Sequence, residues 1–80
     1  MILYIKDGCA HSARVLNAVD TFGVSLEVKN VADSGVAQEL LERGGKSQEP
    51  FLYDEAKGTG LYESADIIAL LTREYGTKRA

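Results

Sequence analysis

The sequence is poor in cysteine, proline and tryptophan. Its 80 residues include one cysteine, Cys9, one proline, Pro50, and no tryptophan. A single cysteine cannot form an internal disulfide, so we expect a fold without covalent cross-links in a reducing compartment, the cytoplasm. Long apolar segments are also missing, and we therefore expect neither a signal peptide nor a membrane as partner.

Positive charge is scarce as well. Nine Lys and Arg against 12 Asp and Glu give a net charge of −3, and no basic stripe is present. This balance argues against nucleic acid as a partner. The content of 45% hydrophobic and 26% charged residues is that of an ordinary globular protein. We expect a single domain over residues 1–80 and a monomer.

Hydrophobic patterning predicts four short strands. Residues 2–5 are continuously apolar, which is typical of a central strand covered on both faces. Residues 26–29 alternate between apolar and polar, which favours a half-buried edge strand. After Pro50, residues 51–53 and 61–62 form two further apolar stretches on either side of a polar turn, and this arrangement predicts an antiparallel hairpin.

Three segments have apolar residues at helical spacing. The first runs from Ala10 to Phe22, the second begins near an Asp33 or Ser34 cap and ends at residues 44–45, and the third begins at a Ser64 cap. The positions predicted to face the core are Ala13, Val15, Leu16, Val19 and Phe22 in the first helix, Val36, Ala37, Leu40 and Leu41 in the second, and Ile67, Ile68, Leu71 and Tyr75 in the third.

The predicted order of elements is βαβ-α-ββα. Two strands joined by a helix are parallel with a right-handed crossover, whereas the last two strands form a hairpin. The continuous first strand belongs in the centre of the sheet and the alternating second strand at its edge. The sequence therefore predicts an α/β protein with a four-stranded mixed sheet and helices on both faces, which is the thioredoxin-like fold.

The surroundings of Cys9 are typical of a reactive thiol. Cys9 stands where the first predicted helix begins, and backbone N–H groups and the helix dipole favour a thiolate there. Ser12 follows three residues later, where its hydroxyl reaches the thiol, or it is merely a serine at the start of a helix. His11 either supports the thiolate as imidazolium or lines the mouth of the site. A buried, inert cysteine is the alternative interpretation.

Three segments of the chain resemble known families. Residues 4–6 followed by Gly8 and Cys9 resemble the approach to the active-site cysteine of glutaredoxins, and residues 44–52 are similar to their segment around a cis-proline. Residues 61–68 are more similar to the glutathione S-transferase N-terminal domain. The Cys9-Ala10-His11-Ser12 motif has serine in place of a second cysteine, so this resemblance is to a monothiol member.

The resemblance implies a site for glutathione as co-substrate. Lys6 would meet a glutathione carboxylate, Pro50 would be cis and face the cysteine, and the backbone of Glu49 would pair with the cysteinyl part. Acidic Glu49 departs from the small or apolar residue usual at its position. The remaining implied contacts are to the γ-glutamyl group, from Glu63, Ser64 and Asp66. Alternatively, Lys6 is a solvated lysine and Ser64 an ordinary helix cap.

Because Ser12 cannot resolve a disulfide, an external thiol must release Cys9. The sequence therefore predicts a glutathione-dependent thiol-disulfide oxidoreductase that reduces glutathionylated proteins or small disulfides, with no metal. One alternative is an iron–sulfur carrier, in which two copies share a [2Fe-2S] cluster through Cys9 and two glutathione thiolates. Another alternative is a module that binds glutathione without turnover.

Overall fold

The computed structural model describes residues 1–76, which fold into seven elements in the predicted order. The strands are β1 (Ile2–Ile5), β2 (Glu27–Asn30), β3 (Phe51–Asp54) and β4 (Thr59–Leu61). The helices are α1 (Ala10–Phe22), α2 (Val36–Gly44) and α3 (Ser64–Tyr75). Within the described residues, no helix combines the length and apolarity needed to cross a bilayer.

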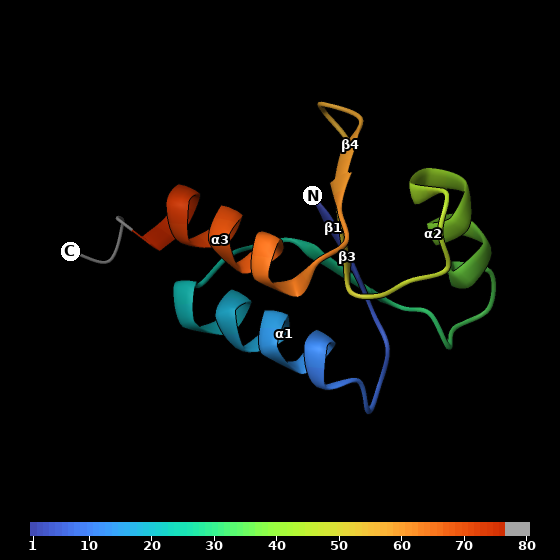
Figure 1. Cartoon of the computed structure of the whole chain (residues 1–80), viewed down its shortest axis with the longest axis horizontal. Helices are drawn as coiled ribbons and strands as arrows, with labels where there is room; N and C mark the ends of the chain where they lie inside the picture. The colour runs from blue at the N-terminus through green and yellow to red at the C-terminus, as the bar shows by residue number, and fades with distance from the viewer. Residues whose placement is uncertain (77–80) are drawn as a thin grey trace.

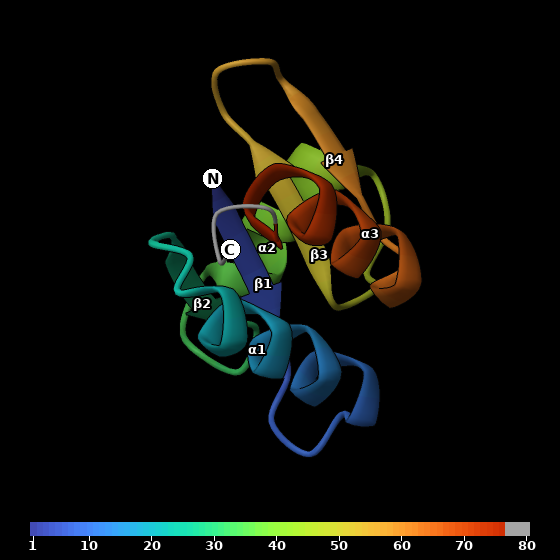
Figure 2. The same cartoon turned by 90° about the vertical axis from the view of Figure 1, so that its left-hand side faces the viewer.

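The four strands form one mixed sheet in the order β2-β1-β3-β4. β1 is parallel to β2 and antiparallel to β3, and β3 is antiparallel to β4. Figure 1 shows α1 and α3 packed side by side on one face of the sheet and α2 on the other, and Figure 2 looks onto the face that α1 and α3 cover, with the sheet and α2 behind them. The predicted thioredoxin-like fold is confirmed, with β1 in the centre and β2 at an edge.

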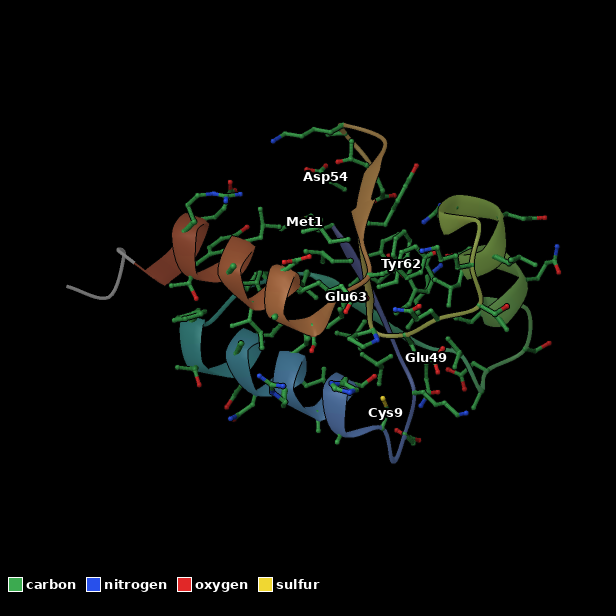
Figure 3. The ribbon with its side chains drawn as sticks, viewed as in Figure 1. Met1, Cys9, Glu49, Asp54, Tyr62 and Glu63 are labelled. Carbon is green, nitrogen blue, oxygen red and sulfur yellow. The ribbon has the colours of Figure 1, made fainter. Side chains whose placement is uncertain are left out.

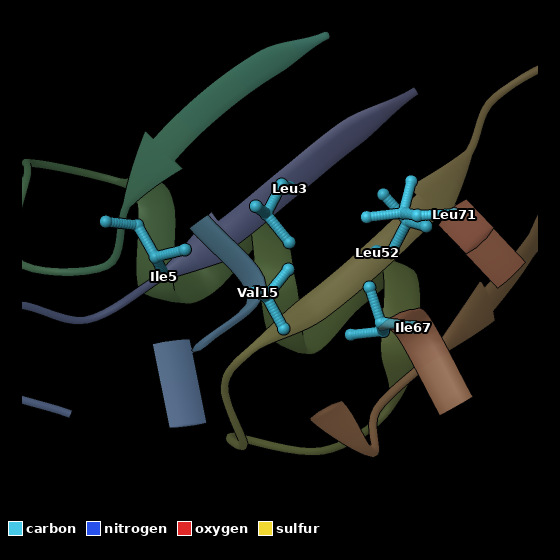
Figure 4. Close-up of a cluster of buried hydrophobic side chains, with 6 residues drawn as sticks. All are labelled: Leu3, Ile5, Val15, Leu52, Ile67 and Leu71. Atoms are coloured by element: carbon cyan, nitrogen blue, oxygen red, sulfur yellow. The ribbon is translucent and has the colours of Figure 1, made fainter. Parts of the chain in front are cut away.

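The central strand β1 is buried on both faces and supplies both halves of the core. Leu3 and Ile5 point into the layer under α1 and α3, and Ile2 and Tyr4 into the layer under α2, as the period of two along a strand requires. Figure 4 shows the first layer, which consists of Leu3, Ile5, Val15, Leu52, Ile67 and Leu71. The second layer consists of Ile2, Tyr4, Leu40 and Phe51.

The predicted helix caps are wrong at two of the three N-termini. The N-cap of α2 is Gly35, with φ of +83°, rather than Asp33 or Ser34. A left-handed residue is needed there because the turn after β2 closes tightly, and glycine adopts this conformation without steric cost. The N-cap of α3 is Glu63, so that Ser64 is the first helical residue and is buried.

Several apolar residues of the predicted strands and helices are exposed. Val28 of β2 and Leu41 of α2 are 45% and 41% exposed. Ala13 and Ala37 also lie on the surface. Edge strand β2 has no neighbour on its outer side, and the nine-residue helix α2 contacts the second core layer mainly along one stripe, through Leu40.

Candidate functional site

Cys9 is the N-cap of α1, as the sequence predicts. Its backbone is extended (φ −88°, ψ 120°) and its carbonyl accepts the first helical hydrogen bond, from the N–H of Ala13 at 3.0 Å. The N–H of Cys9 donates to the carbonyl of Lys6 at 3.2 Å, which closes the turn between β1 and α1. The thiol is partly buried and not disulfide-bonded. It therefore stands at the positive end of α1.

The surroundings of Cys9 lower the pKa of its thiol. The backbone N–H of Ser12 has the largest effect, followed by the Ser12 hydroxyl, and the N–H of His11 acts in the same direction. Partial burial and the Glu49 carboxylate oppose them. Ser12 is itself buried, and its Oγ accepts a hydrogen bond from the N–H of Lys6 at 3.2 Å. Hydrogen-bond donors at a helix start thus favour the thiolate.

A cavity of about 280 Å³ lies beside Cys9, between the segment before β3 and the start of α3. The Glu49–Pro50 peptide bond on one wall is cis, as the resemblance implies, and Pro50 is buried. Figure 3 shows Cys9 and Glu49 at the same end of the molecule, with Glu63 above them. The residues that line the cavity are His11, Gln48, Glu49, Pro50, Tyr62, Glu63 and Ser64.

Side-chain contacts join the three segments that form this cavity. Oε2 of Glu63 accepts a hydrogen bond from Nε2 of Gln48 at 3.3 Å, across the cavity from the loop to the α3 N-cap. Oγ of Ser64 lies 3.4 Å from Nδ1 of His11, and thus links α3 to α1. His11 is therefore directed to Ser64 and the cavity, and it influences Cys9 through its backbone N–H. The structure thus places His11 in the lining of the cavity, with its ring next to Ser64.

The structure gathers most of the predicted site residues but not all of them. His11, Glu49, Pro50, Glu63 and Ser64 line the cavity. Cys9 and Ser12 do not line it, but His11 lies between them in the chain and the charge of Glu49 acts on Cys9. Lys6 and Asp66 do not line it; both are exposed, Lys6 before Cys9 and Asp66 in the first turn of α3.

Sequence reasoning missed two lining residues, Gln48 and Tyr62. Each is the chain neighbour of a predicted site residue, since Gln48 precedes Glu49 and Tyr62 precedes Glu63. The sequence pattern indicates an apolar strand residue at Tyr62, within the segment that resembles the glutathione S-transferase N-terminal domain. In the structure it follows β4, and its hydroxyl accepts from the N–H of Lys46 at 3.0 Å and donates to the Lys46 carbonyl at 3.1 Å.

A separate polar cluster lies under α2. The Tyr4 hydroxyl donates to Glu39 and accepts a hydrogen bond from Arg43 at 2.9 Å, and Lys29 forms an ion pair with Glu39 at 2.8 Å. Burial, followed by the hydrogen bond to Glu39, raises the pKa of Tyr4 to about 12. Arg43 also lies over the ring of Tyr53. Its guanidinium therefore contacts this cluster and not the surroundings of Cys9.

Comparisons with known proteins agree with this architecture. Residues 3–79 match the family model described as glutathione S-transferase, N-terminal domain. No curated protein sequence matches the chain. Among solved structures, an epsilon-class glutathione S-transferase from the housefly Musca domestica superimposes with a TM-score of 0.76 at 24% identity. A glutathione S-transferase from the Antarctic clam Laternula elliptica superimposes with the same TM-score, 0.76, at 20% identity. Each alignment covers 94% of this chain and 35% of the other chain, so this chain spans about a third of the length of those structures.

Proposed function

This chain belongs to the family of glutathione S-transferase N-terminal domains, and from that premise we propose that it binds glutathione beside Cys9 and reduces glutathione mixed disulfides. The observation that carries the proposal is the position of Cys9. Its thiol lies at the N-terminus of α1, where the pKa is lowered, and both the next residue but one, His11, and Glu49, whose charge acts on the thiol, line a cavity bounded by cis-Pro50. A thiolate next to a ligand cavity is what disulfide exchange requires.

The reaction proceeds in two exchanges. The Cys9 thiolate attacks the glutathione sulfur of a mixed disulfide, the S–S bond breaks, and the substrate leaves as a thiolate that takes a proton from water. A second glutathione, as thiolate, then attacks the glutathione sulfur bound to Cys9 and releases the Cys9 thiolate and glutathione disulfide. Overall, the substrate is released as a thiol, one free glutathione is consumed and one glutathione disulfide forms. Because Ser12 carries no thiol, the second step depends on free glutathione.

The binding roles follow from the chemistry of glutathione, which has two carboxylates and one ammonium group. Backbone N–H groups in the first turn of α3 suit the γ-glutamyl carboxylate, since a helix N-terminus attracts anions. The carboxylates of Glu63 and Asp66 suit the ammonium group. The backbone of Glu49, next to cis-Pro50, suits the cysteinyl part, and exposed Lys6 suits the other carboxylate.

The first experiment is the reduction of the glutathione–mercaptoethanol mixed disulfide, with glutathione present, by the wild-type protein and by Cys9→Ser. We expect turnover above the uncatalysed rate that disappears in Cys9→Ser. Full turnover by Cys9→Ser would contradict the proposal. A conjugation assay with an electrophilic aromatic halide tests transfer of glutathione instead, the activity that the names of the two similar structures describe.

Binding is measured separately from turnover. S-methylglutathione, which cannot exchange disulfides, is titrated into the wild-type protein, Glu63→Gln and Glu74→Gln. Both variants remove one carboxylate from α3 or its cap, but Glu74 lies near the other end of the helix. We expect weaker binding for Glu63→Gln and wild-type binding for Glu74→Gln. Saturable binding without Cys9-dependent turnover would favour the non-catalytic module, and visible absorbance after anaerobic purification would favour the iron–sulfur carrier.

A further inference from the structure

The charged side chains that line the cavity beside Cys9 are acidic. Its charged side chains are Glu49 and Glu63, with His11 as the one other titratable group besides a tyrosine, and no lysine or arginine of the described residues lines it. Glu63, the N-cap of α3, accepts a hydrogen bond from Gln48. Glu49 stands on the other wall, and no hydrogen bond or ion pair within residues 1–76 uses its carboxylate.

Glu49 is placed where its charge acts on the reacting sulfur. It is half-buried immediately before the cis peptide bond to Pro50, and it lies at the same end of the molecule as Cys9 (Figure 3). The Glu49 carboxylate raises the pKa of the Cys9 thiol, as the smallest of the effects on it, so its charge is felt at the sulfur. A charge that is felt at Cys9 is also felt by charged groups attached to a sulfur that exchanges with it.

We propose that Glu49 makes the site selective for mixed disulfides whose non-glutathione half carries a positive charge near its sulfur. The class includes aminothiols and peptides with lysine or arginine beside the cysteine. This inference rests on the proposed function and names its substrate class. When Cys9 attacks the glutathione sulfur, the leaving thiol departs from the neighbourhood of Cys9, where Glu49 attracts cations and repels anions. Glutathione disulfide, whose leaving half is anionic, is accordingly a poorer substrate than a cationic mixed disulfide.

Three mixed disulfides of glutathione test this selectivity, with cysteamine, mercaptoethanol and 3-mercaptopropionate as the second half. They are similar in size and differ in charge: cationic, neutral and anionic. The measured quantity is kcat/KM for the cationic disulfide divided by kcat/KM for the anionic one. The intrinsic reactivity of each disulfide is the same with every protein variant, so a change in this ratio reports the effect of the protein's charge.

We expect Glu49→Gln to lower the cation-to-anion ratio by about 3- to 10-fold, because a charge pair near the surface changes each rate by about two- to threefold and the two opposite changes multiply. Glu49→Lys is expected to lower the ratio further, and added salt to reduce the wild-type preference. Asp7→Asn is the control: it removes a negative charge two residues from Cys9 but outside the cavity. A ratio unchanged in Glu49→Gln, or changed equally in Asp7→Asn, would overturn the inference.

A second measurement keeps this inference separate from the proposed function. Methanethiosulfonates that carry a trimethylammonium or a sulfonate group transfer their thiol part to Cys9, whose thiolate displaces a sulfinate, without any need for glutathione. We expect Glu49→Gln to lower the ratio of the two labelling rates by a similar factor. If no disulfide is turned over but this ratio falls, the proposed function fails and the charge selectivity at Cys9 stands. If turnover occurs and neither ratio responds, only the selectivity is refuted.

Discussion

Replacing Tyr62 with phenylalanine removes one oxygen atom that joins the start of α3 to the loop before β3. The hydroxyl accepts from the N–H of Lys46 and donates to its carbonyl, at 3.0 and 3.1 Å, and so fixes the peptide groups at one residue of the loop. The ring stacks on Phe51 with centroids 4.4 Å apart, and a phenylalanine would keep this stack. The substitution therefore isolates the two hydrogen bonds.

The expected loss of stability is about 1 kcal/mol. A neutral hydrogen bond contributes about 0.5–1.5 kcal/mol net, and water can replace part of these two because the Lys46 backbone is exposed. In a domain of this size, about 1 kcal/mol lowers Tm by roughly 4–8 °C. We also expect weaker binding of S-methylglutathione, because the released loop continues into Glu49 and Pro50 on the cavity wall.

Tyr53→Phe is the matched control for Tyr62→Phe. Tyr53 also packs near Phe51, with ring centroids 6.0 Å apart, but no hydrogen bond within residues 1–76 uses its hydroxyl. Urea denaturation gives the free energy of unfolding for both variants, and calorimetric titration gives the affinity for S-methylglutathione. Equal stability losses in the two variants, with equal affinities, would refute the reasoning that the Tyr62 hydroxyl holds the loop.

Three further substitutions have defined outcomes. Ser12→Ala removes a hydroxyl that stabilises the thiolate, so the pKa of Cys9 rises, as read from the pH dependence of its alkylation by iodoacetamide. Tyr4 ionises at a pKa of 10.0 in the unfolded chain and of about 12 in the folded one, so the free energy of unfolding falls as the pH rises between these two values. We expect Tyr4→Phe to lack this part of the alkaline loss, as measured by urea denaturation at a series of pH values. Gly60→Ala brings a Cβ to 2.3 Å from the ring of Phe51 and lowers the free energy of unfolding by about 1–3 kcal/mol.

Each of these outcomes has a control or an opposite result. An unchanged alkylation profile in Ser12→Ala would show that its backbone N–H alone favours the thiolate. For the alkaline transition, a fall of equal size in Tyr4→Phe would assign the loss to other groups. Gly76→Ala is the control for Gly60→Ala, since its Cβ would meet Thr72 at 3.4 Å and Phe22 at 3.9 Å, both ordinary contacts; equal effects of the two substitutions would contradict the steric argument.

The order and type of the elements were predictable because they follow from local patterns. The continuous apolar run at residues 2–5 became central β1, and α1 spans the predicted range from Ala10 to Phe22. Gly23 and Gly45 end α1 and α2 in the left-handed conformation. Hydrophobic periodicity and glycine stops act over a few residues, so they are visible without the tertiary structure.

Caps and exposure were predicted less well because they depend on how the chain enters and leaves each element. Asp33, Ser34 and Ser64 are all good capping residues by type, yet Gly35 and Glu63 occupy the cap positions. The shift of one residue buries Ser64 and turns its Oγ towards His11. Side-chain preference indicates a helix start, but the backbone angles of the preceding turn decide which residue caps it.

The sequence by itself determined the thiol at a helix start, because Cys9, Ser12 and the helix that follows are neighbours in the chain. Only the tertiary structure decided what surrounds that thiol. Glu49 acts on Cys9 across forty residues of sequence, and Tyr62 holds Lys46 from the far side of the hairpin. Such contacts arise when the sheet brings distant segments to one edge, and a local pattern does not specify them.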